Sequence, residues 1–249
     1  MLFFNPSKAR LWEIDFLRGI AVAMMIVFHL LYDLNYFAGH SFVLSAGFWW
    51  LFARFTAVIF VFLVGVSLTL SHSRARASMS GKEMTIKYTK RGLKIFGWGL
   101  LITALTWLFM SGNGTIWFGV LHLIGVSIIL ARPLLGRRFL SLFLAFAFMI
   151  AGLYLSTMVF DFPWLMPLGF TPAGFYALDY LPVLPWFGVV LFGMFFGSTF
   201  YPEGKRLFHL RSKAPGALKP LCLVGRHSLF IYLLHQPVLI GVLYAALLI

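Results

Sequence analysis

Several long apolar stretches of this sequence contain ionisable side chains, which are costly to bury and therefore draw attention first. The first stretch carries four of them: Asp15, Arg18, His29 and Asp33. At about 100° per residue, a helix places all four within an arc of about 60°. They would form one polar stripe facing the interior of a helix bundle, and such residues mark a functional site by default.

His29 and Asp33 are separated by four residues, so on a helix they are neighbours that can touch. A carboxylate beside an imidazole fixes its tautomer, raises its basicity and stabilises its protonated form. That arrangement suits a general base. The alternative is a buried hydrogen bond between the two that only locks helices together.

Arg54, His122 and His235 lie in other apolar stretches. At a rise of about 1.5 Å per residue, Arg54 and His122 lie about 9 Å from the outer ends of their stretches. His29 and His235 lie about 20 Å from the inner ends, which is a similar depth. We therefore expect one polar layer in the outer half, with Arg54 paired to Asp33, because an unpaired arginine there is expensive. Imidazoles suit zinc, but the spacing completes no ligand shell, so no metal is expected.

The composition makes lipid the expected solvent of this chain. Of the 249 residues, 61% are hydrophobic and 11% are charged, where soluble domains carry about 25% charged residues. The single cysteine, Cys222, excludes an internal disulfide and a CxxC metal site.

The apolar stretches predict an all-α, polytopic transmembrane bundle of about seven spans, forming a single domain over residues 1–249. The expected spans are Phe16–Tyr36, Phe48–Leu70, Leu93–Met110, Ile116–Leu130, Phe139–Met158, Val183–Tyr201 and Cys222–Ile249. Most of them are close to the roughly 20 residues that cross a bilayer as a helix.

The connections between these stretches alternate in charge. Lys and Arg occur before the first span and in the second, fourth and sixth connections, whereas the first, third and fifth have none. Because basic residues concentrate on cytoplasmic loops, the N-terminus is expected in the cytoplasm and the C-terminus outside. The net charge of +13 therefore indicates membrane topology rather than nucleic-acid binding.

Six motifs, in order along nearly the whole chain, resemble bacterial proteins related to heparan-α-glucosaminide N-acetyltransferase. They are IDFLRG at 14–19, FLVG at 62–65, GVLHLIG at 119–125, LPWFG at 184–188, GRHSL at 225–229 and YLLHQP at 232–237. The spacing from Arg18 to His29 and the His-Gln-Pro ending are also similar to acyltransferase-3 membrane proteins.

The resemblance implies N- or O-acetyl transfer from cytoplasmic acetyl-CoA, as co-substrate, to an acceptor outside: an amino sugar, a glycan or a small molecule. It implies a multi-pass protein of a bacterial inner membrane. In the lysosomal enzyme, the histidine held responsible for acetyl transfer lies in the loop after the first helix. The residue at that position here is His40. In acyltransferase-3 proteins it lies within the helix and matches His29. The two relatives point to different residues.

The predicted layout suits this chemistry. Basic side chains bind the phosphates of a nucleotide, and three arginines lie near the cytoplasmic side: Arg18, Arg91 and Arg226. Together with Asp15, beside Arg18 on the first span, they are the expected cofactor-binding residues. The pantetheine arm would then reach His29, the base, while Arg54 or a second histidine stabilises the oxyanion. Whether an acetyl-histidine intermediate forms stays open, and Arg91 is equally suited to snorkelling toward headgroups.

Two other functions remain open at this level. A proton-coupled transporter would also use a layer of buried histidines, and a scaffold would use them as hydrogen bonds between helices. The basic cytoplasmic face favours the acetyltransferase, and the absence of a visible internal repeat disfavours the transporter. The expected partners are acetyl-CoA, an acceptor and membrane lipids, without nucleic acid; a homo-oligomer is left open.

Overall fold

The computed structural model describes residues 11–110 and 114–247. Helices dominate those ranges, and their order is α1 (Trp12–Ala38), α2 (Gly47–Arg76), α3 (Gly81–Phe109), α4 (Val120–Leu130), α5 (Arg138–Leu155), α6 (Val183–Phe200), α7 (Lys219–Arg226) and α8 (Ser228–Leu247). Four 3-10 turns join them at Arg132–Leu134, Met166–Leu168, Pro202–Gly204 and Gly216–Leu218. The prediction of an all-α, multi-pass protein is confirmed.

Six helices in the described ranges are long and apolar enough to cross a membrane: α1, α2, α3, α5, α6 and α8. They overlap six of the seven expected spans. The last of these, expected over Cys222–Ile249, is divided, because α7 ends at Arg226 and α8 begins at Ser228. The remaining stretch, Ile116–Leu130, is helical only over the 11 residues of α4. Residues 115–119, which directly precede α4, are not helical.

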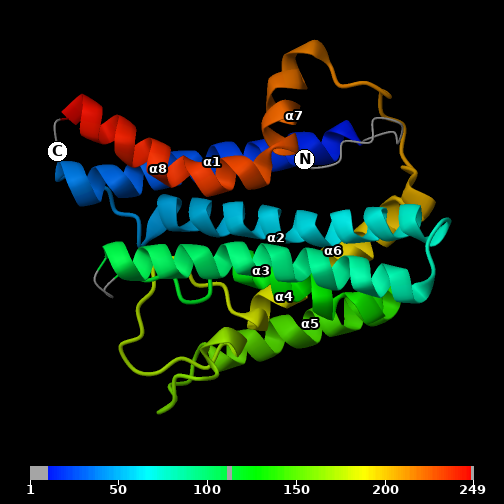
Figure 1. Ribbon diagram of the computed structural model, residues 1–249, viewed down its shortest axis with the longest axis horizontal. Helices are drawn as coiled ribbons and strands as arrows, with labels where there is room; N and C mark the ends of the chain where they lie inside the picture. The colour runs from blue at the N-terminus through cyan, green and yellow to red at the C-terminus, as the bar shows by residue number, and fades with distance from the viewer. Residues whose placement is uncertain (1–10, 111–113, 248–249) are drawn as a thin grey trace. The chain divides into compact units, whose positions relative to one another are not determined.

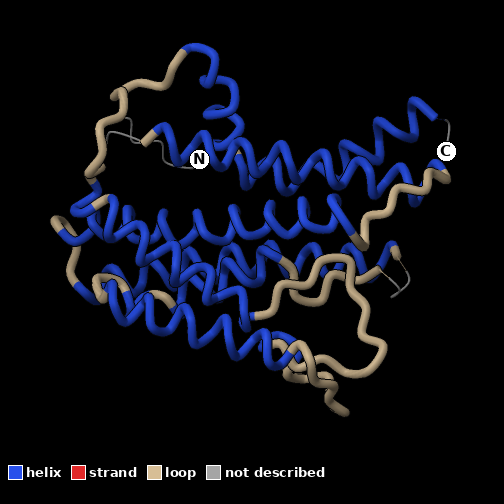
Figure 2. Tube along the Cα trace, turned by 180° about the vertical axis from the view of Figure 1, so that it is seen from behind, coloured by secondary structure: helices blue, strands red, loops and turns tan. Residues whose placement is uncertain are grey.

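The chain divides into two compact units, and α2 passes from one to the other. The terminal unit comprises residues 1–60 and 210–249, and the central unit comprises residues 61–209. Figure 2 shows that helices supply most of both units and that the connection between α5 and α6 is mostly loop.

In the terminal unit, α1 contacts both α7 and α8 (Figure 1). Two glycines allow the α1 and α7 backbones to touch. A Cβ on Gly19 would collide with the carbonyl oxygen of Leu221, and one on Gly225 would collide with that of Asp15. Small residues permit such close approach between helices in membranes. The contact holds the end of α7 against the first turns of α1.

In the central unit, α5 packs along α6, α3 packs along α4, and α4 also contacts α6. The α3–α4 contact depends on Gly99, because a Cβ there would lie 3.0 Å from three atoms of the His122 ring. The missing side chain on α3 therefore makes room for an imidazole on α4.

Candidate functional site

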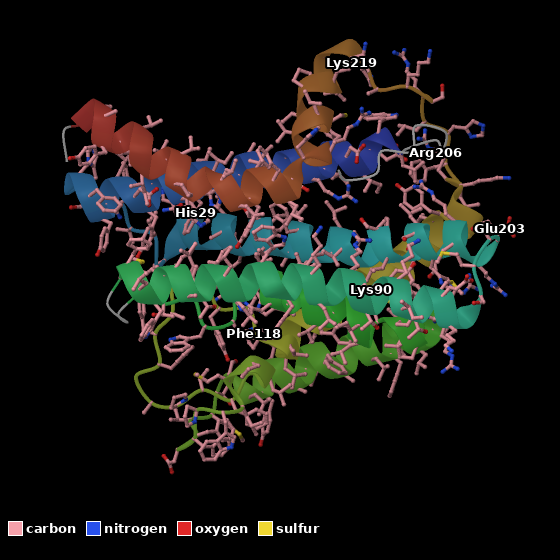
Figure 3. The ribbon with its side chains drawn as sticks, viewed as in Figure 1. His29, Lys90, Phe118, Glu203, Arg206 and Lys219 are labelled. Carbon is pink, nitrogen blue, oxygen red and sulfur yellow. The ribbon has the colours of Figure 1, made fainter. Side chains whose placement is uncertain are left out.

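Two histidines meet between α1 and α8 in the terminal unit. The rings of His29 and His235 lie edge to face, with centroids 4.7 Å apart and an interplanar angle of 86°; Figure 3 labels His29 on α1. The structure therefore brings together two of the predicted catalytic residues, which are more than two hundred residues apart in sequence.

Each of these imidazoles is oriented by a backbone carbonyl of its own helix. His29 Nδ1 lies 2.8 Å from the Met25 oxygen, and His235 Nδ1 lies 2.6 Å from the Tyr232 oxygen. A carbonyl oxygen only accepts, so both Nδ1 atoms carry the proton and the lone pair of each neutral ring is on Nε2. His235 Nε2 is buried and has no hydrogen-bond partner among the described residues. It is an unused proton acceptor.

Asp33 lies on the same face of α1 and is buried, with only 1% of its surface exposed. Gln236 Nε2 donates to its Oδ1 at 2.6 Å. The predicted hydrogen bond between His29 and Asp33 is wrong, because the Met25 carbonyl accepts the Nδ1 proton of His29 and the amide of Gln236 binds the carboxylate. Gln236 was missed in the sequence, although it stands beside His235 in the YLLHQP motif.

Arg54 does not join this group. Its side chain is exposed on α2, and its guanidinium lies 5.4 Å from the ring centroid of Trp50, one turn earlier. Among the described residues it forms no ion pair with Asp33, so that prediction is wrong. The ring of Trp50 is a favourable partner for the Arg54 cation, and it lies toward the end of α2, where a long side chain can reach the membrane surface. Arg54 therefore does not need a buried carboxylate.

His40 lies just beyond α1, in an exposed loop. Gly39, at φ 69°, ends the helix. The side-chain amide of Asn35 then holds the loop: its Nδ2 donates to the Phe42 carbonyl at 2.7 Å, and its Oδ1 accepts from the Phe42 N–H at 2.9 Å. The His40 ring stacks on Phe42 at 5.7 Å. Because α1 ends at Ala38, nine residues after His29, about 14 Å of helix rise separates His29 from the end of α1, where the loop with His40 begins.

At the other end of α1, three of the predicted nucleotide-binding residues form one cluster. Asp15 is buried and lies 3.2 Å from Arg18 and 3.2 Å from Arg226 of α7. Both guanidinium groups remain partly exposed, with 27% and 38% of their side-chain surfaces accessible. One carboxylate orients two cations here. Arg91, in contrast, is exposed on α3 in the central unit.

His122 belongs to the central unit and uses both of its ring nitrogens. The Gly119 N–H donates to its Nδ1 at 3.2 Å, and its Nε2 lies 3.4 Å from Thr103 Oγ1. Thr103 in turn donates to the carbonyl of Ile116 at 2.5 Å. With Phe118 stacked on its ring and Phe96 edge to face with it, His122 is a satisfied core residue that ties α3 to the chain entering α4.

That chain, residues 115–119, is non-helical and hydrogen-bonded by its neighbours. Thr106 of α3 accepts from Ile116 N at 3.1 Å, Asp179 accepts from Val120 N at 3.0 Å, and Leu181 N donates to the Phe118 carbonyl at 2.9 Å. Irregular backbone is tolerated at membrane depth where protein groups satisfy it in this way. The carboxylate of Asp179 also suits the positive end of α4.

Tyr180 completes this support from the α5–α6 connection. Its hydroxyl donates to the carbonyl of Met166 at 2.6 Å, and burial raises the pKa of Tyr180 to about 12. The phenol therefore stays protonated and keeps donating across the physiological pH range. Asp179 and Tyr180 lie in a loop without apolar periodicity, and no sequence signal indicated them.

The comparisons with known proteins agree with the motifs. The model of the family described as heparan-alpha-glucosaminide N-acetyltransferase, catalytic, matches residues 10–237. No curated protein and no solved structure matches the chain. The matched range runs through both units and includes every candidate residue discussed above. The chain therefore belongs to the heparan-alpha-glucosaminide N-acetyltransferase catalytic family.

Proposed function

We propose that this membrane acetyltransferase takes an acetyl group from cytoplasmic acetyl-CoA and transfers it to an acceptor on the outer side, in a bacterial inner membrane. The observation that carries the proposal is the His29–His235 pair, in which Nδ1 of each ring is held by a carbonyl and a buried Nε2 has no partner. This is the state that a general base requires.

The nucleotide end is assigned to Arg18 and Arg226. Guanidinium groups bind phosphates through paired N–H donors, and Asp15 fixes the orientation of both. Along α1, Arg18 and His29 are separated by about 16 Å of helix rise. An extended pantetheine arm would run between these two levels, with its phosphates at the arginines and its thioester at the histidines.

At the histidines the acceptor's amine or hydroxyl attacks the thioester carbonyl. Nε2 of His235 or His29 takes the acceptor proton as the new bond forms, the carbon–sulfur bond breaks, and the proton passes to the departing CoA thiolate. The neighbouring imidazole, when protonated, donates to the carbonyl oxygen that gains negative charge. A direct transfer and an acetyl-histidine intermediate both use the same two nitrogens.

The topology behind this direction of transfer has seven crossings, with α4 included. The 11 residues of α4 rise about 16 Å as a helix. The five non-helical residues before it, 115–119, can reach at most about 16 Å, which together with α4 is enough for the roughly 30 Å hydrocarbon core. The basic connection after α4 then lies in the cytoplasm, as the loop charges require.

Alanine variants of the two histidines test the proposal. We expect His29→Ala and His235→Ala to keep CoA affinity and to lose about 10²–10⁴-fold in acetyl transfer, the range for loss of a general base. The matched control is His209→Ala, since His209 is exposed in the α6–α7 connection. Acetylation of a small amine or amino sugar and CoA binding are both measured in detergent.

His40→Ala decides between the two related families, one of which points to the loop residue His40 and the other to the helix residue His29. Near-normal turnover in His29→Ala and His235→Ala, with loss in His40→Ala, would move the chemistry to the loop. A protein that binds neither CoA nor acetyl-CoA would favour the proton-coupled transporter, for which proton uptake into vesicles is the corresponding measurement.

A further inference from the structure

A second cationic site lies in the central unit, where three segments meet. Arg132, after α4, donates from Nη2 to the carbonyl of Gly81 at the start of α3, at 3.1 Å. Near the end of α2, Nε2 of His72 lies 3.8 Å from the position that a Cβ on Gly136 would take. His72, Arg76 and Arg132 are called the loop cluster below.

The loop cluster contains polar atoms that no described residue satisfies. Nε of Arg132 and Nδ1 of His72 are both buried without a hydrogen-bond partner. Arg76 follows His72 by four residues on α2, so the two side chains are neighbours on one face of that helix. A buried N–H without an acceptor costs stability, and such groups in a native structure call for a bound partner.

No carboxylate of the described residues neutralises these cations. Glu83 is engaged at the start of α3, where its Oε2 accepts from the Ser80 N–H at 2.7 Å. Glu203 and Arg206 (Figure 3) lie in the segment that follows α6. This segment passes close to the end of α2, since a Cβ placed on Gly204 would lie 3.7 Å from the Cβ of Ser73. Glu203 is exposed and forms no ion pair within the described ranges. Arg76 and Arg132 form none there either.

We propose that the loop cluster binds a phosphate group, supplied by an anionic lipid headgroup or by a soluble phosphate. The Arg132 guanidinium presents an unused N–H, Arg76 adds a second guanidinium, and His72 adds a ring nitrogen. Arginine forks match the geometry of phosphate oxygens. The cluster stands at the basic ends of α2 and α3, two helices apolar enough to span a membrane, which is where headgroup phosphates lie.

The test uses the full chain in detergent, with phosphatidate of short chain length and inorganic phosphate as separate probes. Arg76→Gln is the first variant, because Arg76 makes no hydrogen bond in the described part of the structure and its loss should not impair folding. Arg76→Gln/Arg132→Gln removes two charges of the cluster. Lys82→Gln/Lys90→Gln removes two exposed charges from α3 and is the matched control.

Affinity for at least one probe should fall about tenfold in Arg76→Gln and further in the double variant, as for lost hydrogen bonds to a charged group. The lysine control should stay within about threefold. Tighter binding of phosphatidate than of phosphate identifies a headgroup as the source, and equal binding identifies a soluble phosphate. Absence of binding by both probes, or equal losses in the cluster and lysine variants, overturns the proposal. The result is independent of acetyl transfer, since no cluster residue belongs to the histidine site.

Discussion

The two histidines between α1 and α8 differ from His122 in their hydrogen bonds. Each of the two donates from Nδ1 to a carbonyl and keeps its lone pair on Nε2, whereas His122 accepts at Nδ1 and has Thr103 at Nε2. Residue type and depth placed all three in one predicted layer. The tautomers of His29 and His235 depend on carbonyls of their own helices, and that of His122 depends on Gly119 and on Thr103 of α3. Hydropathy carries no information about these partners.

Asp33 and Gln236 form a buried hydrogen bond, so removing one partner should cost stability that removing the second does not add again in full. Gln236→Ala leaves the Asp33 carboxyl buried without its donor, so the loss of stability should be about 1–3 kcal/mol. Asp33→Ala/Gln236→Ala removes both partners and should lose less than the two single variants together. Thermal unfolding in detergent measures this, and strictly additive losses would show that the pair is not coupled.

Among the elements, α4 shows most clearly how far the sequence could predict the fold. Residues 116–130 are apolar enough to suggest a full span, yet only Val120–Leu130 is helical. The reason lies on other segments: Thr106, Asp179 and Leu181 satisfy the backbone before α4. The long helices were predictable because each satisfies its own backbone and needs only a run of apolar residues.

The α1–α7 contact provides a prediction at the same scale. Gly19→Ala and Gly225→Ala each place a methyl group against a carbonyl oxygen of the partner helix, so each should destabilise the protein by about 1–3 kcal/mol. Gly97→Ala is the control: it lies within α3, and a Cβ there meets nothing within 4 Å. Its effect should stay within about 0.5 kcal/mol. Equal losses at all three glycines would refute a specific backbone contact.

For the whole molecule, the alternating loop charges predict which loops face the cytoplasm and which face outside. A cysteine at Ser45 should react with a membrane-impermeant thiol reagent added from outside, and cysteines at Ser78 and Ser212 should not. All three positions are exposed. Labelling of Ser212→Cys from outside, with Ser78→Cys protected, would mean that the short α4 does not cross. The direction proposed for acetyl transfer would then lose its topological support.

The burial of Cys222 has a practical consequence for the unfolding of the terminal unit. Its thiol is 2% exposed and lies 3.6 Å from the carbonyl of Trp12, and burial, reinforced by Asp15, raises the pKa of Cys222. Since the thiolate is the reactive form, the native thiol should resist maleimide at neutral pH and leave introduced cysteines as the labelled sites. When α7 separates from α1, Cys222 becomes accessible. Its rate of modification therefore reports the opening of this contact, and Gly225→Ala should accelerate it.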